Sequence, residues 1–176
     1  MEIITLTEHL QLVNNVLDAD EYTEFLTECV QGNLFFQQQY PGRAFTEARH
    51  QEWLLSYFSK LSKINGEREL QQIFLGLELP GSEMLLHRSH PNIGSVMIYN
   101  LDNSPVTNLR TVESSDPTVN YINNQVADGL PGATERYPFA ANTAYVLRNS
   151  AQAPLWGFSG GISPNYVKRS VWIYLS

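Results

Sequence analysis

The sequence predicts an α+β fold in which helices pack outside a jelly roll of β-strands. Three observations predict it. Apolar residues recur at helical spacing over residues 1–66, whereas residues 69–176 form strand-like pieces separated by Pro, Gly, Asn and Asp. No repeat or low-complexity linker divides the 176 residues. Short antiparallel strands close most simply as a jelly roll, so we expect one domain over residues 1–176 with one core.

The N-terminal third reads as helical, because Leu10, Val13 and Leu17 repeat at helical spacing and acids open the next segment. Its expected elements are helices over 8–17 after Thr7, over 20–30 before Gly32 and over 47–63 after Thr46, with a strand over 33–40. The expected strands of the second part cover 69–79, 83–89, 94–101, 108–114, 142–150 and 168–175.

Composition limits the classes of function. The chain has 11 Lys and Arg against 18 Asp and Glu, a net charge of −7, which argues against nucleic acid as a partner. Cys29 is the only cysteine, which excludes an internal disulfide and a thiol zinc site. No run approaches the roughly 20 apolar residues that span a bilayer, and the N-terminus lacks signal-peptide features. We therefore expect a cytoplasmic protein with no membrane partner.

Two segments together resemble the iron- and 2-oxoglutarate-dependent oxygenases. Residues 79–102, LPGSEMLLHRSHPNIGSVMIYNLD, are similar to that family's passage from a Pro-Gly turn through a His-x-Asp motif into a strand. Residues 138–176 are similar to its closing passage, in which a strand that begins with Asn leads to a His-Gly pair and then to a strand with Arg-Ser. The resemblance implies a double-stranded β-helix with the N-terminal helices packed outside the barrel.

The resemblance also implies a metal site with altered ligands. Family members hold Fe(II) with two histidines and one carboxylate. His87 falls at the first histidine, Ser89 at the acid and Trp156 at the second histidine. A serine hydroxyl brings no charge to a dication, and an indole nitrogen only donates. The expected metal site is therefore degenerate, with His87 as its remaining ligand.

A different ligand set stays open. Strand alternation places Glu83 and His87 on one face, about 13 Å apart at 3.3 Å per residue, and His90 joins them only if the chain turns. For His87 itself, the alternative to a ligand is a histidine that is satisfied inside the barrel.

Two further residues carry the expected cosubstrate site. Alternation places Arg169 in an aliphatic row with Val167 and Val171, so we expect it to point into the barrel. The resemblance implies that Arg169 binds the distal carboxylate of 2-oxoglutarate; the alternative is a salt bridge to one of the chain's own acids. Tyr99 ends its strand where a family tyrosine lies near the cosubstrate, unless it is a packing residue.

The resulting hypothesis is an oxygenase-like protein that lacks normal iron chemistry and binds a small anion or a partner in the barrel. The alternative is an active Fe(II)/2-oxoglutarate-dependent dioxygenase, a hydroxylase with an atypical metal site, which would need both cofactors. A cupin-like barrel and an assembly subunit, a homodimer with an exposed aromatic face at Trp53, Tyr57 or Trp172, are further alternatives. No residue is assigned a catalytic role, and Cys29 is a poor nucleophile candidate.

Overall fold

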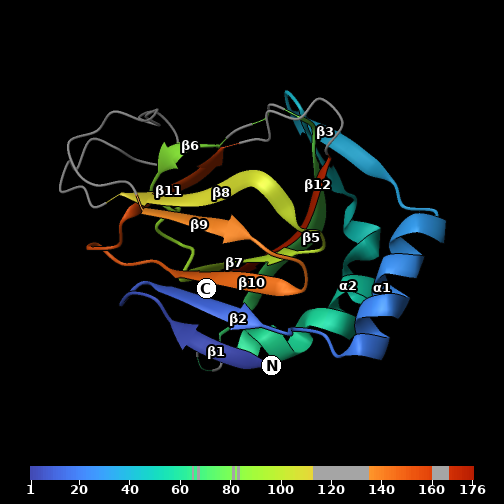
Figure 1. The fold of residues 1–176 in the computed structure, drawn as a ribbon, viewed down its shortest axis with the longest axis horizontal. Coiled ribbons are helices and arrows are strands. Elements are labelled where there is room, and N and C mark those ends of the chain that lie inside the picture. The colour runs from blue at the N-terminus through green and yellow to red at the C-terminus, as the bar shows by residue number, and fades with distance from the viewer. Residues whose placement is uncertain (65, 67, 81, 83, 113–134, 160–166) are drawn as a thin grey trace.

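Two antiparallel sheets form the molecule (Figure 1). The computed structural model describes residues 1–64, 66, 68–80, 82, 84–112, 135–159 and 167–176. The major sheet has the order β1 (Glu2–Thr5), β2 (Leu10–Asn14), β10 (Thr143–Arg148), β7 (Ser95–Asn100), β12 (Lys168–Leu175), β5 (Leu70–Glu78), β4 (Arg43–Thr46) and β3 (Phe36–Tyr40). The minor sheet has the order β6 (Met84–His87), β11 (Leu155–Ser159), β8 (Ser104–Val112) and β9 (Glu135–Phe139).

From β5 to β12 the chain crosses repeatedly between the two sheets. β5, β7, β10 and β12 are neighbours in the major sheet, while β6, β8, β9 and β11 make up the minor sheet. This exchange of antiparallel strands between two facing sheets is the double-stranded β-helix, so the predicted fold class is confirmed. Six predicted strands correspond to β3, β5, β6, β7, β10 and β12, and the strand predicted over 108–114 overlaps β8.

The helices lie together beside the major sheet, on the side away from the minor sheet (Figure 1). α1 (Ala19–Gln31) begins at a capping box, in which Asp18 accepts from the Glu21 amide and Glu21 accepts from the Asp18 amide. α2 (Gln51–Phe58) is flanked by the 3₁₀ helices η1 (Ala48–His50) and η2 (Ser59–Lys63). Among the described residues, no helix is long and apolar enough to cross a membrane.

The N-terminal third contains four strands, so the expectation of a helical 1–66 is wrong in part. The predicted helix over 8–17 is strand β2, because β1 and β10 pair with it on both sides and satisfy its backbone. Asn15 then takes a positive φ of 50°, which ends the strand. Thr46 does not open a helix: it ends β4, and its hydroxyl accepts from the Leu75 amide at 3.0 Å.

The major sheet has a different core on each face. The helix-side core packs the sheet against α1 and α2 and is mainly aliphatic on the sheet, with Leu75, Met97, Val171 and Ile173. The barrel core lies between the two sheets and is rich in rings: Phe45, Phe74, Phe139, Tyr145, Trp156, Phe158 and Trp172. Sheet alternation sends neighbouring residues of β12 into different cores.

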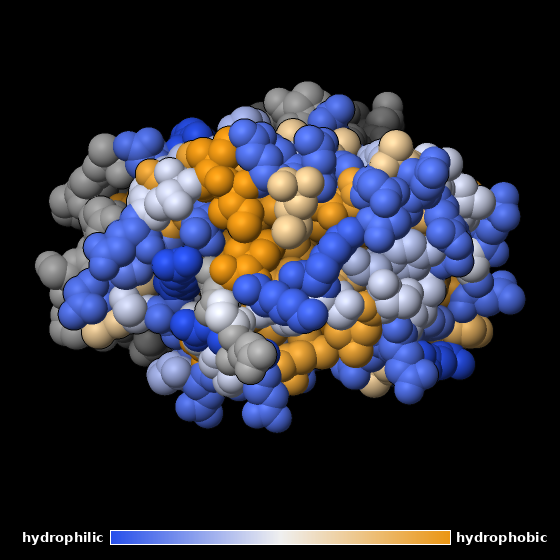
Figure 2. All heavy atoms as spheres, turned by 90° about the horizontal axis from the view of Figure 1, so that it is seen from below, coloured by the Kyte–Doolittle hydropathy of each residue, from blue (hydrophilic) through white to orange (hydrophobic). Residues whose placement is uncertain are grey.

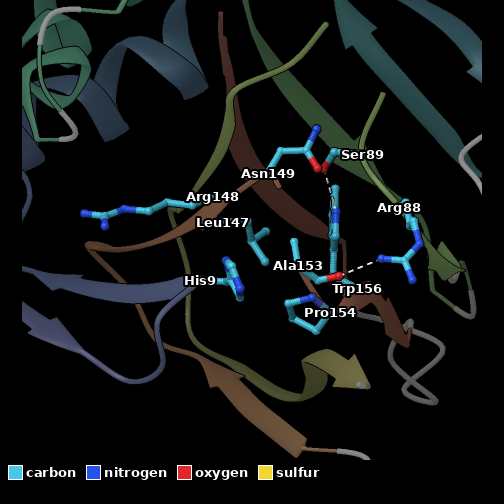
Figure 3. Close-up of a pocket in the computed structure, with 9 residues that line it drawn as sticks. All are labelled: His9, Arg88, Ser89, Leu147, Arg148, Asn149, Ala153, Pro154 and Trp156. Carbon is cyan, nitrogen blue, oxygen red and sulfur yellow. Dashed lines mark hydrogen bonds between the residues drawn. The ribbon is translucent and has the colours of Figure 1, made fainter. Parts of the chain in front are cut away.

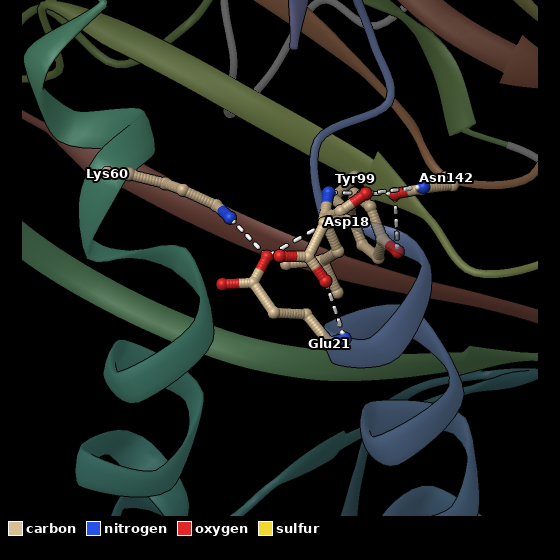
Figure 4. A network of polar contacts seen from close by, with 6 residues as sticks. Asp18, Glu21, Lys60, Tyr99 and Asn142 are labelled. Atoms are coloured by element: carbon tan, nitrogen blue, oxygen red, sulfur yellow. Dashed lines mark hydrogen bonds and ion pairs between the residues drawn. The ribbon is translucent and has the colours of Figure 1, made fainter.

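A polar network joins the start of α1 to the helix-side face (Figure 4). The Asn142 side chain accepts from the Leu17 amide at 2.9 Å and donates to the Leu17 carbonyl at 2.8 Å. The Tyr99 hydroxyl donates to the same Asn142 oxygen at 3.3 Å. Asn142 has a φ of 55°, a conformation that asparagine tolerates better than most residues. This turn residue thereby fixes how the helical layer meets the sheet.

The edge strand β1 carries apolar side chains that reach the surface. Figure 2 views the molecule from below, the side on which β1 lies in Figure 1, and apolar atoms emerge there between hydrophilic ones. Ile3 and Ile4 are 46% and 37% exposed. The strand is only four residues long and includes Glu2, two features that limit pairing between sheet edges.

Candidate functional site

The structure brings the three predicted metal-site positions together at one end of the barrel. Trp156 of β11 pairs with His87 of β6, and their ring centroids are 4.5 Å apart. A bulge in β6 sets this geometry, because the next paired residues are Phe158 and Met84. Trp156 and Met84 belong to the barrel core, so His87 is held against the interior of the barrel and is only 9% exposed.

A hydrogen bond joins two of these three side chains. The Trp156 indole Nε1 donates to the Ser89 hydroxyl oxygen at 2.9 Å. The two side chains at the positions of the acid and the second histidine therefore bond to each other. Of the three, only His87 carries a nitrogen that could act as a ligand.

The described part of the chain contains no alternative set of metal ligands. No three of its His, Cys, Asp or Glu side chains lie close enough together to hold a metal ion. Glu83 of the alternative set lies outside the described residues. His90 lies in the turn after β6, where its Nδ1 accepts from the Asn92 amide at 3.1 Å and its carbonyl accepts from the Ile93 amide.

A buried charge cluster lies inside the opposite end of the barrel, and the sequence analysis missed it. Lys168 Nζ lies 2.8 Å from a carboxylate oxygen of Glu78, and Arg43 Nε lies 3.4 Å from the other oxygen. The Ser170 hydroxyl oxygen accepts from the Lys168 ammonium at 3.3 Å and from the Trp172 indole at 2.9 Å. The sequence signal for this cluster is strand alternation, which predicts that Lys168, Ser170 and Trp172 lie on one face of β12.

Burial governs the electrostatics of this cluster. The side chains of Lys168 and Glu78 are 5% and 2% exposed. Burial lowers the pKa of Lys168 from its usual range, and the adjacent Glu78 carboxylate opposes that effect. Rings surround the two cations: Lys168 lies 4.3 Å from the Phe139 centroid, and Arg43 lies 5.3 Å from that of Phe158. Glu78 thus contacts two cationic side chains in a ring-walled interior.

A row of aromatic rings connects the two ends of the barrel interior. Trp156 lies beside His87, its centroid is 6.2 Å from that of Trp172, and Trp172 is 5.9 Å from Phe158. Phe158 in turn lies 4.7 Å from the Lys168 ammonium. Among the described residues, a continuous row of aromatic side chains therefore separates the two ends of the barrel interior.

Arg169 lies on the opposite face from the one expected. The prediction that it points into the barrel is wrong: its guanidinium makes a two-pronged pair with Asp102, at 2.7 and 2.8 Å. That pairing raises the pKa of Arg169. Alternation correctly grouped Arg169 with Val171, but this aliphatic row packs on the helices, while the larger aromatic side chains fill the barrel. The alternative of a salt bridge to an acid of the chain is what the structure contains.

Tyr99 and Trp172 also lie where their expected roles do not fit. Tyr99 is fully buried on the helix side, with its ring 4.7 Å from that of Phe58, so it packs against α2 and not near the barrel interior. Trp172 is 0% exposed and cannot contribute to a surface patch. Cys29 is partly buried beside the same core, and burial raises the pKa of its thiol to about 12, which disfavours the nucleophilic thiolate.

Solved structures share this fold. HygX from Streptomyces hygroscopicus, with nickel, 2-oxoglutarate and hygromycin B bound, is 11% identical with a TM-score of 0.68, over 96% of this chain and 82% of that one. A 2OG-Fe(II) oxygenase family oxidoreductase from Burkholderia pseudomallei is 12% identical (TM-score 0.65; 96% and 84%). A prolyl hydroxylase from Trichoplax adhaerens is 12% identical (TM-score 0.60; 96% and 84%).

The chain thus has the fold of the iron- and 2-oxoglutarate-dependent oxygenases, and the resemblance of residues 79–102 and 138–176 is confirmed at that level. No protein-family model matches the chain, and no curated protein sequence matches it either. At such low identity the fold is shared while the chemistry has to be argued from this chain's own residues.

Proposed function

We propose that this protein uses an oxygenase fold without iron chemistry and binds a small carboxylate anion inside the barrel, at Lys168 and Arg43. The observation that carries the proposal is the bond between Trp156 and Ser89 where the family places two metal ligands. An N–H donor that faces a hydroxyl oxygen offers a divalent cation neither charge nor a free lone pair of nitrogen.

The donor set at the His87 end does not fit Fe(II). Facial coordination by two histidines and a carboxylate supplies two imidazole nitrogens and one negative charge. Here the only imidazole of the three is His87, and Ser89 is neutral. A single neutral imidazole is too weak a ligand set to compete with water for Fe(II), so we derive no step of the function from a metal.

The charge at the other end supports an anionic ligand. Arg43 and Lys168 bring two cationic side chains to one buried, aromatic-walled place beside Glu78. A carboxylate that approaches these two side chains would form charge-assisted hydrogen bonds with them, which are stronger than neutral ones. Solved structures with the same fold contain bound 2-oxoglutarate, a small dicarboxylate.

Calorimetric titration with 2-oxoglutarate in metal-free buffer tests the proposal. We expect saturable binding to the unmodified protein and at least a tenfold loss of affinity in Lys168→Met, because one charge-assisted hydrogen bond is removed. The matched control is Arg169→Leu, which changes the adjacent residue on the other face of β12 and should bind normally. Lys168→Arg keeps the charge and should retain binding.

The opposite pattern would refute the anion site: no binding, or equal binding in the Lys168→Met and unmodified proteins. Thermal unfolding of each variant shows whether a loss of binding follows from a loss of folding. The alternative, an active dioxygenase, is tested by a separate measurement. Succinate formed from 2-oxoglutarate in the presence of Fe(II) would contradict the absence of iron chemistry.

A further inference from the structure

Asn100 of β7 carries a buried polar atom that the fold leaves without a partner. Its side chain lies on the barrel side of the major sheet, since Met97 and Tyr99 belong to the helix-side core and Ile98 to the barrel core. Asn100 is 1% exposed, and its Oδ1 is buried with no hydrogen-bond partner among the described residues. An unpaired buried acceptor costs free energy, so a donor supplied by a ligand would remove that cost.

The orientation of this amide follows from its other contacts. Asn100 Nδ2 donates to the carbonyl and to the hydroxyl oxygen of Thr143 on β10, at 3.4 Å each. A carbonyl oxygen accepts and cannot donate, so the amide nitrogen has to face Thr143 and Oδ1 has to face away from it. The group that Asn100 leaves unpaired is therefore an acceptor, and only a donor can satisfy it.

Asn100 lies next to the buried charge cluster. It pairs with Ser170 of β12 in the register of the two strands, and the Cα atoms of paired antiparallel residues are about 4.5 to 5.5 Å apart. The Ser170 hydroxyl oxygen in turn lies 3.3 Å from the Lys168 ammonium. The unpaired acceptor and the buried cation are thus separated by a single residue inside the barrel.

The cleft at the His87 end of the barrel is too small to hold an organic ligand. It lies beside Trp156 and Ser89 and has room for about one water molecule (Figure 3). The indole and the hydroxyl of these two residues already bond to each other. Lys168 and Asn100, at the opposite end, are the groups that a ligand can pair with.

We propose that Asn100 determines the specificity of the anion site and that the ligand is a small 2-hydroxy carboxylic acid. The Lys168 ammonium holds the carboxylate, and the hydroxyl on the adjacent carbon donates to Asn100 Oδ1. This inference rests on the proposed function, because it requires the carboxylate at Lys168. A hydroxyl is a better donor here than an ammonium, because Lys168 and Arg43 already bring cationic side chains to this place.

Malate, succinate and aspartate are the probes, because they share two carboxylates on a four-carbon chain and differ only at C2. That carbon bears a hydroxyl in malate, hydrogen alone in succinate and an ammonium in aspartate. In calorimetric titration we expect one enantiomer of malate to bind about tenfold more tightly than succinate, and aspartate to bind more weakly than that enantiomer. The malate hydroxyl pairs with Asn100 Oδ1, whereas succinate leaves this oxygen unpaired.

Asn100→Leu removes the acceptor at nearly constant side-chain size and should bind malate and succinate equally. Asn14→Leu is the matched control, because Asn14 lies in the same row across the sheet, on the far side of Thr143, and its side chain donates to Glu2. This control should keep the preference for malate. Thermal unfolding shows whether each variant is folded, and the comparison of malate with succinate in the unmodified protein needs no variant.

Failure of this inference can be told apart from failure of the proposed function. If 2-oxoglutarate and succinate bind and lose affinity in Lys168→Met, but neither malate enantiomer binds better than succinate, the hydroxy-acid inference is wrong and the anion site stands. A preference for malate that persists in folded Asn100→Leu overturns the inference in the same way. If none of these carboxylates binds, the proposed function is wrong as well.

Discussion

The two faces of the major sheet differ in how deeply their charged pairs are buried. On the helix side the charged pair is Arg169 with Asp102, whose side chains are 27% and 29% exposed. On the barrel side it is Lys168 with Glu78, whose side chains are 5% and 2% exposed. The helix side buries aliphatic residues of the sheet against α1 and α2, and the barrel buries rings around cations.

Because of this difference, the proposed function is assigned to the barrel side of the sheet. Buried charge costs free energy unless it is paired, so a chain keeps it where a ligand or a specific geometry requires it. The helix-side pair is partly exposed to water and holds Asp102 beside β12. The barrel pair lies deep among rings, at one end of an interior whose other end holds His87, Ser89 and Trp156.

The strongest test of this contrast is removal of the barrel carboxylate. Glu78→Gln should lower the free energy of unfolding by about 3 to 5 kcal/mol, because it removes the carboxylate that pairs with the buried Lys168 ammonium. Urea denaturation measures the loss. Glu47→Gln, at an exposed pair with Arg49, should change stability by less than about 0.5 kcal/mol. Equal effects of the two variants would remove the distinction between the faces.

A cavity on the helix side should cost stability without touching the ligand site. Leu54→Ala removes a fully buried side chain of α2 and should cost about 2 to 4 kcal/mol in urea denaturation. At a temperature at which the variant is folded, its affinity for 2-oxoglutarate should equal that of the unmodified protein. A matching loss of affinity would mean that the helical layer belongs to the binding site.

The barrel core also predicts a dependence of stability on alkaline pH. Burial raises the pKa of Tyr145 from about 10 to about 12. Between these values the unfolded tyrosine ionises while the folded one stays neutral, so its stabilising contribution is present below pH 10 and is lost as the pH rises toward 12. We expect this loss to be about 2 kcal/mol.

Tyr145→Phe isolates this contribution, because the variant lacks only the hydroxyl that donates to the Pro138 carbonyl. Its stability, followed by urea denaturation from pH 9 to 12, should fall less steeply than that of the unmodified protein. Parallel pH profiles for the two proteins would show that Tyr145 ionises as freely when folded as when unfolded.

The smallest effect is expected at the helix-side pair. Arg169→Leu should change the free energy of unfolding by no more than about 1 kcal/mol, because its pair with Asp102 is partly exposed to water. Thermal denaturation against Asp102→Asn checks this, since both variants break the same pair and should agree. A loss comparable to that of Glu78→Gln would show that the pair is effectively buried.

Sequence reasoning reached the fold because the strand-like pieces after residue 69 alternate and are separated by turn residues. The family motifs, which carry both order and spacing, also pointed to His87, Ser89 and Trp156, and the structure brings these three residues together. Sequence reasoning misread residues 8–17, where Leu10 and Val13 fit helical spacing but tertiary pairing with β1 and β10 decides the structure.

The second feature that the sequence did not predict is which face of β12 points into the barrel. Alternation fixes which residues share a face, but the choice of the inner face depends on what packs there, and rings rather than aliphatic residues fill this barrel. The charge cluster could not be assembled from the sequence, because Arg43, Glu78 and Lys168 come from three strands that only the sheet order brings together.

The central claim is that the side chains at the family's ligand positions do not form an iron site. Anaerobic titration with Mn(II), followed by the electron paramagnetic resonance signal of the free ion, tests it most directly. We expect no stoichiometric binding up to millimolar Mn(II), with or without 2-oxoglutarate, and tighter binding in the double variant Ser89→Asp with Trp156→His. One ion bound at micromolar concentration by the unmodified protein, and released in His87→Ala, would contradict the account.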